Sequence, residues 1–468
     1  MLRASAACEA AGIPSSSLVS TGFIAQAKAT RAGLGYPNLP WATLPGHPAV
    51  QTREQLRDNL IHVTLPEIID NLTGALAEGT ADEPEPGTRE IVFRGGWSAL
   101  NQHFLEQAWS DGLPIVPPTL DRIEAFLAHT RRAPDEVLGV LLPDSRAATL
   151  WNVAINGVMA GCRPAYMQVL VALAEAMGDP AYGVEHSGNT PGGETLIILS
   201  GPVIRQLGFN CTQGVMRDGF QPNTTVGRFC RLYLRNVAGF LPHKTDKATF
   251  GNTWRVAIAE NEEAVRAIGW PTFGSERGLA EGDSAVTIAR YTGGGMASSM
   301  SGSTPEELLP YLADGLVKQS FWQIMFSVGA GYGMLRPLAL ITPIIAETIA
   351  AAGWSKADVK RFLFERARMP AWEFERLLRD WTRKPIWNLE EESAKGNIPA
   401  EVFAASSNPN RLVPIVWEPE HFMIVVTGDP LRTNAYVFSH NGLRGASVAK
   451  KVPLPKSWDA LRGSQVGS

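Results

Sequence analysis

The segment MAGCRP, from Met159 to Pro164, carries residue types that suit nucleophilic chemistry. Gly161 allows a ligand to approach the backbone closely, and Pro164 is a favoured first residue of a helix. A thiol at a helix N-terminus has a lowered pKa, so Cys162 is a candidate catalytic nucleophile. Arg163 could bind a substrate carboxylate or phosphate through two parallel hydrogen bonds. The alternative is a buried structural cysteine beside a helix-breaking proline.

A second candidate site is the stretch NTTVGR, from Asn223 to Arg228. We expect Thr224 or Thr225 to cap a helix over residues 225–237, because hydroxyl side chains accept from the free amides of a first turn. Asn223 and Thr224 are accordingly predicted to contact the substrate.

Three arginines recur along this predicted helix at i, i+3 and i+7, namely Arg228, Arg231 and Arg235. This spacing places them on one face. A solvated basic face usually explains such a stripe. However, the rest of the helix is apolar, so some of these side chains must lie near the core and need an anionic partner, from the protein or the substrate. We therefore predict that Arg228 and Arg231 bind substrate.

Other polar residues give weaker signals. Asp218 and His186 lie in glycine-rich loops and could transfer protons, although a lone loop histidine is more often only solvated. The eight histidines show no metal-ligand spacing, so no metal site is predicted. The glycine-rich stretches 293–295 and 329–333 are weak phosphate-loop candidates, and the first is expected to open a loop or lid reaching Thr304.

Composition restricts the class of protein. The 468 residues carry a net charge of -4 with no run of Lys and Arg, which argues against a nucleic-acid partner. The most apolar stretch, residues 338–352, is interrupted by Pro343 and Glu347, so it predicts a buried strand followed by a helix and no membrane span. Four cysteines without CxxC spacing and no secretory pattern indicate free thiols in the cytoplasm.

The elements that must position these residues form an α/β pattern. Expected helices cover 1–12, 22–32, 56–76 with a break at Pro66, 120–131, 151–177 with a break at Pro164, 225–237 and 305–318, with another starting at Ser355; expected strands cover 13–20, 41–44, 195–200, 286–291, 413–417 and 422–427. This predicts a small Rossmann-like βα lobe over 1–78, a linker over 79–89 and a larger mixed α/β domain over 90–468. The larger domain could divide into sub-lobes at 90–290 and 291–468.

The first lobe resembles a known family. AACEAAGIP at 6–14, Gly22-Phe23 and PGHP at 45–48 resemble the UGSC-type (seleno)protein family and the related selenoprotein subunit of glycine reductase. In those families a Sec- or Cys-Gly-Ser/Thr-Cys motif precedes the first helix. Here that motif would fall before residue 1, and Cys8 does not replace it. His47 stands in the family's PHP position, which makes it a candidate catalytic residue. Residues 111–290 and 350–445 resemble a companion region of some family members.

The resemblance implies thiol-dependent or reductive chemistry at a carbon–heteroatom bond. We therefore expect an enzyme, an oxidoreductase or lyase, that binds a small anionic or polar substrate between the Cys162 and Asn223–Arg228 segments. The alternatives are a non-catalytic subunit or ligand-binding scaffold for a separate redox polypeptide, and a metal-dependent enzyme with ligands distant in sequence. The sequence identifies no cofactor. It leads us to expect a homo-oligomer, with a redox partner chain as a further option.

Overall fold

The computed structural model describes residues 2–74, 87, 89–380, 387–404, 406–443, 445–455 and 458. The predicted linker therefore lies mostly outside the described residues. The described chain is a mixed α/β protein, as expected. Among the described residues, no helix is long and apolar enough to span a membrane.

The N-terminal lobe follows the predicted alternation. Its elements are α1 (Leu2–Ala10), β1 (Ser17–Ser20), α2 (Ile24–Gly33), β2 (Trp41–Leu44), α3 (Arg53–Asn59) and α4 (Leu65–Thr73). Strands β1 and β2 pair in parallel, and they form a sheet of only two strands within the described residues. A π-helical turn, Leu60–Thr64, joins α3 to α4. Pro66 lies just after this π-helical turn, in the first turn of α4, and the helix continues past it, so the predicted break at Pro66 is wrong.

The larger region contains most of the helices. They are α5 (Trp97–Glu106), α6 (Leu120–Leu127), α7 (Leu150–Ala160), α8 (Met167–Gly178), α9 (Val203–Leu207), α10 (Gln221–Asn236), α11 (Glu262–Ala267), α12 (Pro305–Ser320), α13 (Pro343–Ala351), α14 (Lys356–Arg366), α15 (Ala371–Asp380), α16 (Leu389–Ala394) and α17 (Ala400–Phe403). The predicted break at Pro164 is confirmed, since Pro164 opens the 3-10 turn between α7 and α8. The predicted cap Ser355 forms a capping box with Asp358 at the start of α14.

A mixed sheet is the centre of the larger region. Its strands are β5 (Glu194–Ser200), β6 (Ala257–Ala259), β7 (Ala285–Ser299), β8 (Leu338–Ile341), β11 (Met423–Val426), β12 (Asn434–His440) and β13 (Val448–Lys451), in the order β11-β8-β12-β7-β5-β6 with β13 beside β7. Two short pairs lie outside it: β3 (Val137–Leu141) with β4 (Arg146–Thr149), and β9 (Arg368–Pro370) with β10 (Leu412–Pro414).

The sheet curls until its two edge strands meet at one end. The Asn261 amide, just after β6, donates to the Val426 carbonyl of β11 at 2.8 Å. The Thr427 hydroxyl donates to the Ala259 carbonyl at 2.7 Å. The inner face carries alternate residues of six of the seven strands: Leu196, Ile198, Ile258, Ala289, Tyr291, Leu338, Leu340, Met423, Val425 and Phe438. This alternation is the two-residue period of a strand that has distinct faces.

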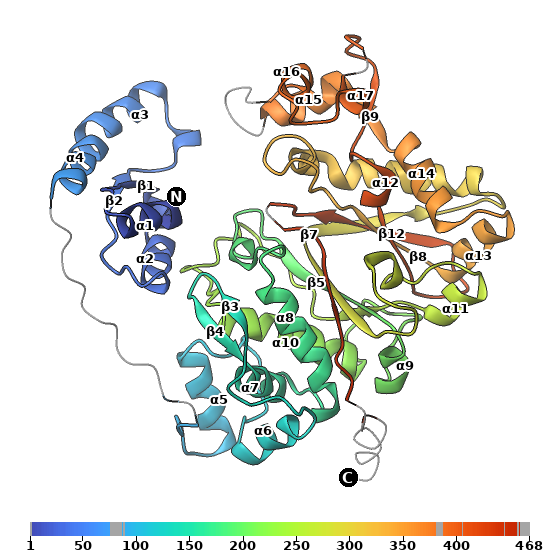
Figure 1. Ribbon diagram of the computed structural model, residues 1–468, viewed down its shortest axis with the longest axis horizontal. Coiled ribbons are helices and arrows are strands. Elements are labelled where there is room, and N and C mark those ends of the chain that lie inside the picture. Colours follow the sequence, from blue (N-terminus) through green and yellow to red (C-terminus); the bar gives the residue numbers. More distant parts are fainter. Residues whose placement is uncertain are drawn as a thin grey trace.

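Helices cover the outer face of the curled sheet. Helices α7, α8 and α10 share a core with outward residues of β5 and β7, such as Ile197 and Ile288. Helices α12, α13 and α14 share another core with β8, β11 and β12, including Ile341 and Val437. In the view of Figure 1, α8 and α10 lie below the strands and α12 lies above them.

Two further predictions about local structure are wrong. Gly293–Gly295 does not open a loop, because β7 runs through it to Ser299 and pairs with β12. A Cβ at Gly294 would lie 2.6 Å from Tyr436 Cε1, so glycine here serves close packing between strands. Thr224 and Thr225 do not cap the helix as expected, because α10 already begins at Gln221 and its N-cap residue is Phe220.

Candidate functional site

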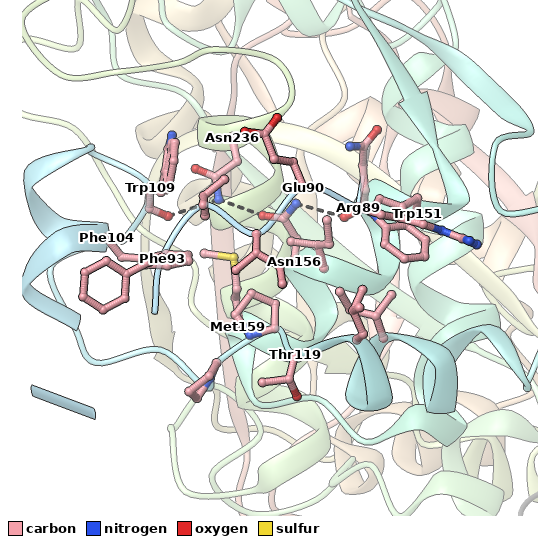
Figure 2. Close-up of a pocket in the computed structure, with 18 of the residues that line it drawn as sticks. Arg89, Glu90, Phe93, Phe104, Trp109, Thr119, Trp151, Asn156, Met159 and Asn236 are labelled. Carbon is pink, nitrogen blue, oxygen red and sulfur yellow. Dashed lines mark hydrogen bonds between the residues drawn. The ribbon is translucent and has the colours of Figure 1, made fainter. Parts of the chain in front are cut away.

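A cavity of about 670 Å³ lies where the chain enters the larger region (Figure 2). Gly87 and residues 89–93 run along it, and α5, the start of α6, α7 and the end of α10 complete its walls. Its volume is in the range of pockets that enclose small molecules.

Apolar side chains make most of the wall. They are Ile91, Val92, Phe93, Leu100, Phe104, Trp109, Pro117, Pro118, Leu120, Ile123, Trp151, Ile155, Met159 and Val237. Several are held by ring contacts: Phe93 stacks on His103 with centroids 4.8 Å apart, and Phe104 meets Trp109 edge-on at 5.4 Å. The wall is therefore preorganised for apolar or aromatic groups.

A chain of amides crosses the cavity (Figure 2). Asn236 Nδ2 donates to Asn156 Oδ1 at 2.8 Å and to the Trp109 carbonyl at 3.1 Å, and Asn156 Nδ2 donates to the Asn152 carbonyl at 2.9 Å. Asn236 Oδ1 is buried and accepts no hydrogen bond from the described residues. An unpaired buried acceptor is costly, so this oxygen favours a ligand or water that donates to it.

Local sequence places these amides. Thr149 and Asn152 form a capping box that starts α7, and this sets Asn156 one turn later on the cavity side. The helix ends at Gly161, whose φ of 82° is the left-handed conformation that glycine adopts without strain. Asn236 is the last residue of α10, so its side chain reaches the cavity from the facing helix.

Two charged side chains lie at the rim, and both are exposed. The Arg89 guanidinium lies 5.0 Å from the centroid of the Trp151 ring. Glu90 Oε2 accepts a hydrogen bond from the Gly87 amide at 2.7 Å. The mouth therefore offers both signs of charge, whereas the interior offers amides and apolar surface.

Cys162 follows α7, directly after its Gly161 cap, and is buried with 8% of its surface exposed. Burial raises the pKa of its thiol to about 12, and a hydrogen bond from Thr225 and the charge of Arg228 offset this only in part. The expected lowering of the pKa is therefore wrong, because desolvation of the thiolate exceeds any stabilisation from the nearby helix start.

The other predicted catalytic residues are exposed and separate from the cavity. His47 precedes a 3-10 turn of the N-terminal lobe, and its Nδ1 accepts from the Ala49 amide at 3.1 Å. Asp218 lies in the loop before α10. Arg163 is also exposed, next to Cys162. None of the three lines the cavity, and their catalytic or binding roles stay predictions.

Asn223 and Thr224 have protein partners. Asn223 is fully buried: its Oδ1 accepts from the Asn210 amide, and its Nδ2 donates to the carbonyls of Asn210 and Ala257. The Thr224 hydroxyl accepts from the Gly219 amide at 3.2 Å. Both side chains thus hold the loop before α10 in place.

The predicted anionic partners of the arginines are supplied by the protein itself. Arg228 binds Asp111 through two hydrogen bonds of 2.8 and 3.0 Å. Arg231 lies 3.3 Å from Glu194 and 2.7 Å from Asp246. The requirement for carboxylates beside partly buried guanidinium groups is confirmed, but each is met within the chain.

The cavity was not predicted from the sequence. Its polar floor comes from Asn152, Asn156 and Asn236, and the i, i+4 spacing of the first two was the one available signal. Among the described residues, no group of three or more His, Cys, Asp or Glu side chains could hold a metal ion.

Comparison with known proteins covers one part of the chain. No curated protein and no solved structure gives a significant match. One protein-family model does match, and it covers the lobe that carries α1 to α4 and the parallel pair β1–β2. The sequence resemblance noted above is thus confirmed for that lobe: residues 1–74 match the UGSC family.

Proposed function

We propose that this chain binds a small, largely apolar molecule that carries one hydrogen-bond donor, in the cavity beneath residues 89–93. In this role it serves as the ligand-binding scaffold of a redox system. The observation that carries the proposal is a cavity of about 670 Å³ with apolar walls and one unpaired buried amide oxygen, Asn236 Oδ1.

The chemistry of the lining supports this ligand class over a small polyanion. Apolar walls stabilise a bound molecule in proportion to the apolar area that they remove from water. Among the described residues that line the cavity, Arg89 is the one cationic side chain, and it is exposed at the rim beside Glu90. Asn236 Oδ1 accepts and cannot donate, so it discriminates in favour of hydroxyl, amine or amide N–H groups.

The redox setting rests on the similarity of residues 1–74 to the UGSC family. The raised pKa of Cys162 removes support from a thiol nucleophile at that position. A scaffold that presents its ligand to a redox group on another polypeptide agrees with both observations. The alternative, that the chain is itself an enzyme, would require a catalytic residue other than Cys162.

A matched pair of probes tests the binding proposal. Indole carries one N–H donor, and benzofuran has the same shape with an oxygen in its place. By titration calorimetry, indole should bind about two- to tenfold more tightly than benzofuran, since one hydrogen bond contributes about 0.5–1.5 kcal/mol. Asn236→Leu should abolish this preference, because it removes the acceptor while keeping the volume.

A second pair of variants locates the site. Ile155→Trp places a large ring in the cavity and should abolish binding of both probes. Val140→Trp, at an exposed β3 position outside the cavity, is the control and should bind like the parent. Equal binding of indole to the two variants would show that this cavity is not the ligand site.

A further inference from the structure

One wall of the cavity beneath residues 89–93 differs from the others in its local structure. Residues 89–95, which we call the strap, lie outside every helix and strand. Most of the other lining residues belong to α5, α6, α7 and α10. The strap supplies five side chains to the lining: Arg89, Glu90, Ile91, Val92 and Phe93.

The strap backbone is not bonded to the walls that the structure describes. From Ile91 to Gly95, no backbone amide or carbonyl forms a hydrogen bond with a described residue. The amide and the carboxylate of Glu90 bond to Gly87, three positions earlier in the same stretch of chain. Segments whose backbone makes few such bonds open at a low free energy. Lifting the strap therefore breaks no backbone hydrogen bond to the described walls.

The outer side of the strap is open. Ile91 and Val92 line the cavity, and yet they are 53% and 40% exposed. The part of the chain that the structure describes thus leaves much of these two side chains uncovered. The strap can consequently move outward without displacing another described element.

Two ring contacts hold the strap against the cavity. Phe93 stacks on His103 of α5 with centroids 4.8 Å apart, and the Arg89 guanidinium lies 5.0 Å from the centroid of the Trp151 ring of α7. Figure 2 shows Arg89 beside Trp151 and Phe93 beside Phe104. Each contact of this kind shifts an equilibrium by about two- to tenfold. Arg89 also has a φ of 69°, a left-handed conformation that is unfavourable for a residue with a side chain.

A glycine next to the ring makes the Phe93 contact possible. A Cβ at Gly95 would lie 2.7 Å from Phe93 Cε1, so any side chain at this position would push the ring away. At Gly96, an added Cβ would meet nothing within 4 Å, and the φ of -75° suits alanine. The two neighbouring glycines therefore give one variant that disturbs the stack on His103 and one that leaves it intact.

We propose that the strap is a lid, which lifts to admit the ligand of the cavity and closes when Phe93 stacks on His103. A bound ligand contacts Ile91, Val92 and Phe93 in the closed arrangement and loses these contacts when the strap lifts. It therefore favours closure, because a ligand shifts an equilibrium toward the state that it binds better. The proposal rests on the proposed function, and it adds how access to that cavity is controlled.

Limited digestion with trypsin tests the lid on the full chain. The strap carries two exposed trypsin sites of its own, Arg89 and Arg94. When opening is fast relative to cleavage, the rate of cleavage follows the population of the open state. Saturating indole should slow cleavage after both arginines at least tenfold. Lys244, exposed between α10 and β6 and outside the cavity lining, is the internal reference, and its rate of cleavage should not change.

Two variants test the lid without ligand. Gly95→Ala should be cleaved in the strap about two- to tenfold faster than the parent, because the ring contact is lost. Gly96→Ala is the matched control and should be cleaved at the parent rate. Each rate is divided by that of a peptide with the same sequence over 84–99, which corrects for the change beside Arg94. An unchanged rate after Lys244 shows that the variants are folded.

The outcomes separate the lid from the binding proposal. Equal corrected rates for Gly95→Ala and Gly96→Ala would overturn the lid. Unchanged cleavage of the strap in the presence of indole that calorimetry shows to be bound would also overturn it, and would leave the proposed function standing. If indole does not bind, the proposed function fails, and the comparison of the two variants without ligand decides on the lid.

Discussion

The accessibility of Cys162 to chemistry provides the most direct test of the reasoning. The pKa of this thiol rises from an ordinary value of 9.0 to about 12 because burial disfavours the thiolate. Each pKa unit changes the thiolate fraction tenfold at a pH well below both values, so this fraction falls about 1000-fold. Since the thiolate is the nucleophile, we expect iodoacetamide to label Cys162 about 1000-fold more slowly in the folded protein than in the urea-unfolded chain.

The assay is time-resolved labelling at constant pH, with each cysteine-containing peptide quantified by mass spectrometry. Cys8, which is half-buried, serves as an internal reference that should label faster. Thr225→Val removes a hydrogen bond that lowers the pKa of Cys162, so it should slow labelling further. Labelling of folded Cys162 within about tenfold of the unfolded rate, or a pH profile that levels off below pH 9, would refute the burial argument and restore the nucleophile hypothesis.

Four further predictions concern stability, measured by urea unfolding. Arg228→Met leaves the nearly buried Asp111 carboxylate without its partner and should cost about 3–5 kcal/mol, with a smaller loss in the Arg228→Met/Asp111→Asn double variant. Burial alone would raise the pKa of Asp111, but the hydrogen bonds and charge of Arg228 lower it below its ordinary value of 3.8. The stability that this carboxylate contributes is therefore complete above pH 3.8 and should be lost as the pH falls below that value. Burial raises the pKa of Glu260 to about 7, so the stability that its protonated carboxyl contributes is complete below pH 4.5 and is lost as the pH rises through 7. Glu260→Gln should flatten the dependence of the unfolding free energy on pH in this range. An unchanged pH dependence in the variant would contradict the raised pKa of Glu260. Gly161→Ala forces a left-handed φ on alanine and should cost about 1–2 kcal/mol, whereas a neutral result would show that the α7 cap relaxes.

Local signals predicted many elements correctly. The Ser355 cap, the start at Pro164 and the end of α1 before Gly12 each depend on a few neighbouring residues. The glycine run 293–295 was misjudged because its role lies in a partner strand. Tyr436 of β12 packs where a Cβ at Gly294 would be, and the residues around position 294 do not indicate this contact.

The candidate sites were less predictable than the elements. The arginines of α10 correctly indicated partly buried cations, but the sequence left open whether protein or substrate supplied the anions. The answer lies in Asp111, which is 117 positions from Arg228. The thiol of Cys162 illustrates the same limit, since its environment is set by packing and not by the proline that follows it.

By itself, the sequence determined the α/β class, the similarity of the first lobe to the UGSC family, and the helix starts and ends that neighbouring residues encode. Only the tertiary structure decided which charges pair and where a cavity opens beneath residues 89–93. The physical reason is distance along the chain. Caps and periodicity act within a few residues, whereas strand register and burial bring together groups that are 100 or more positions apart.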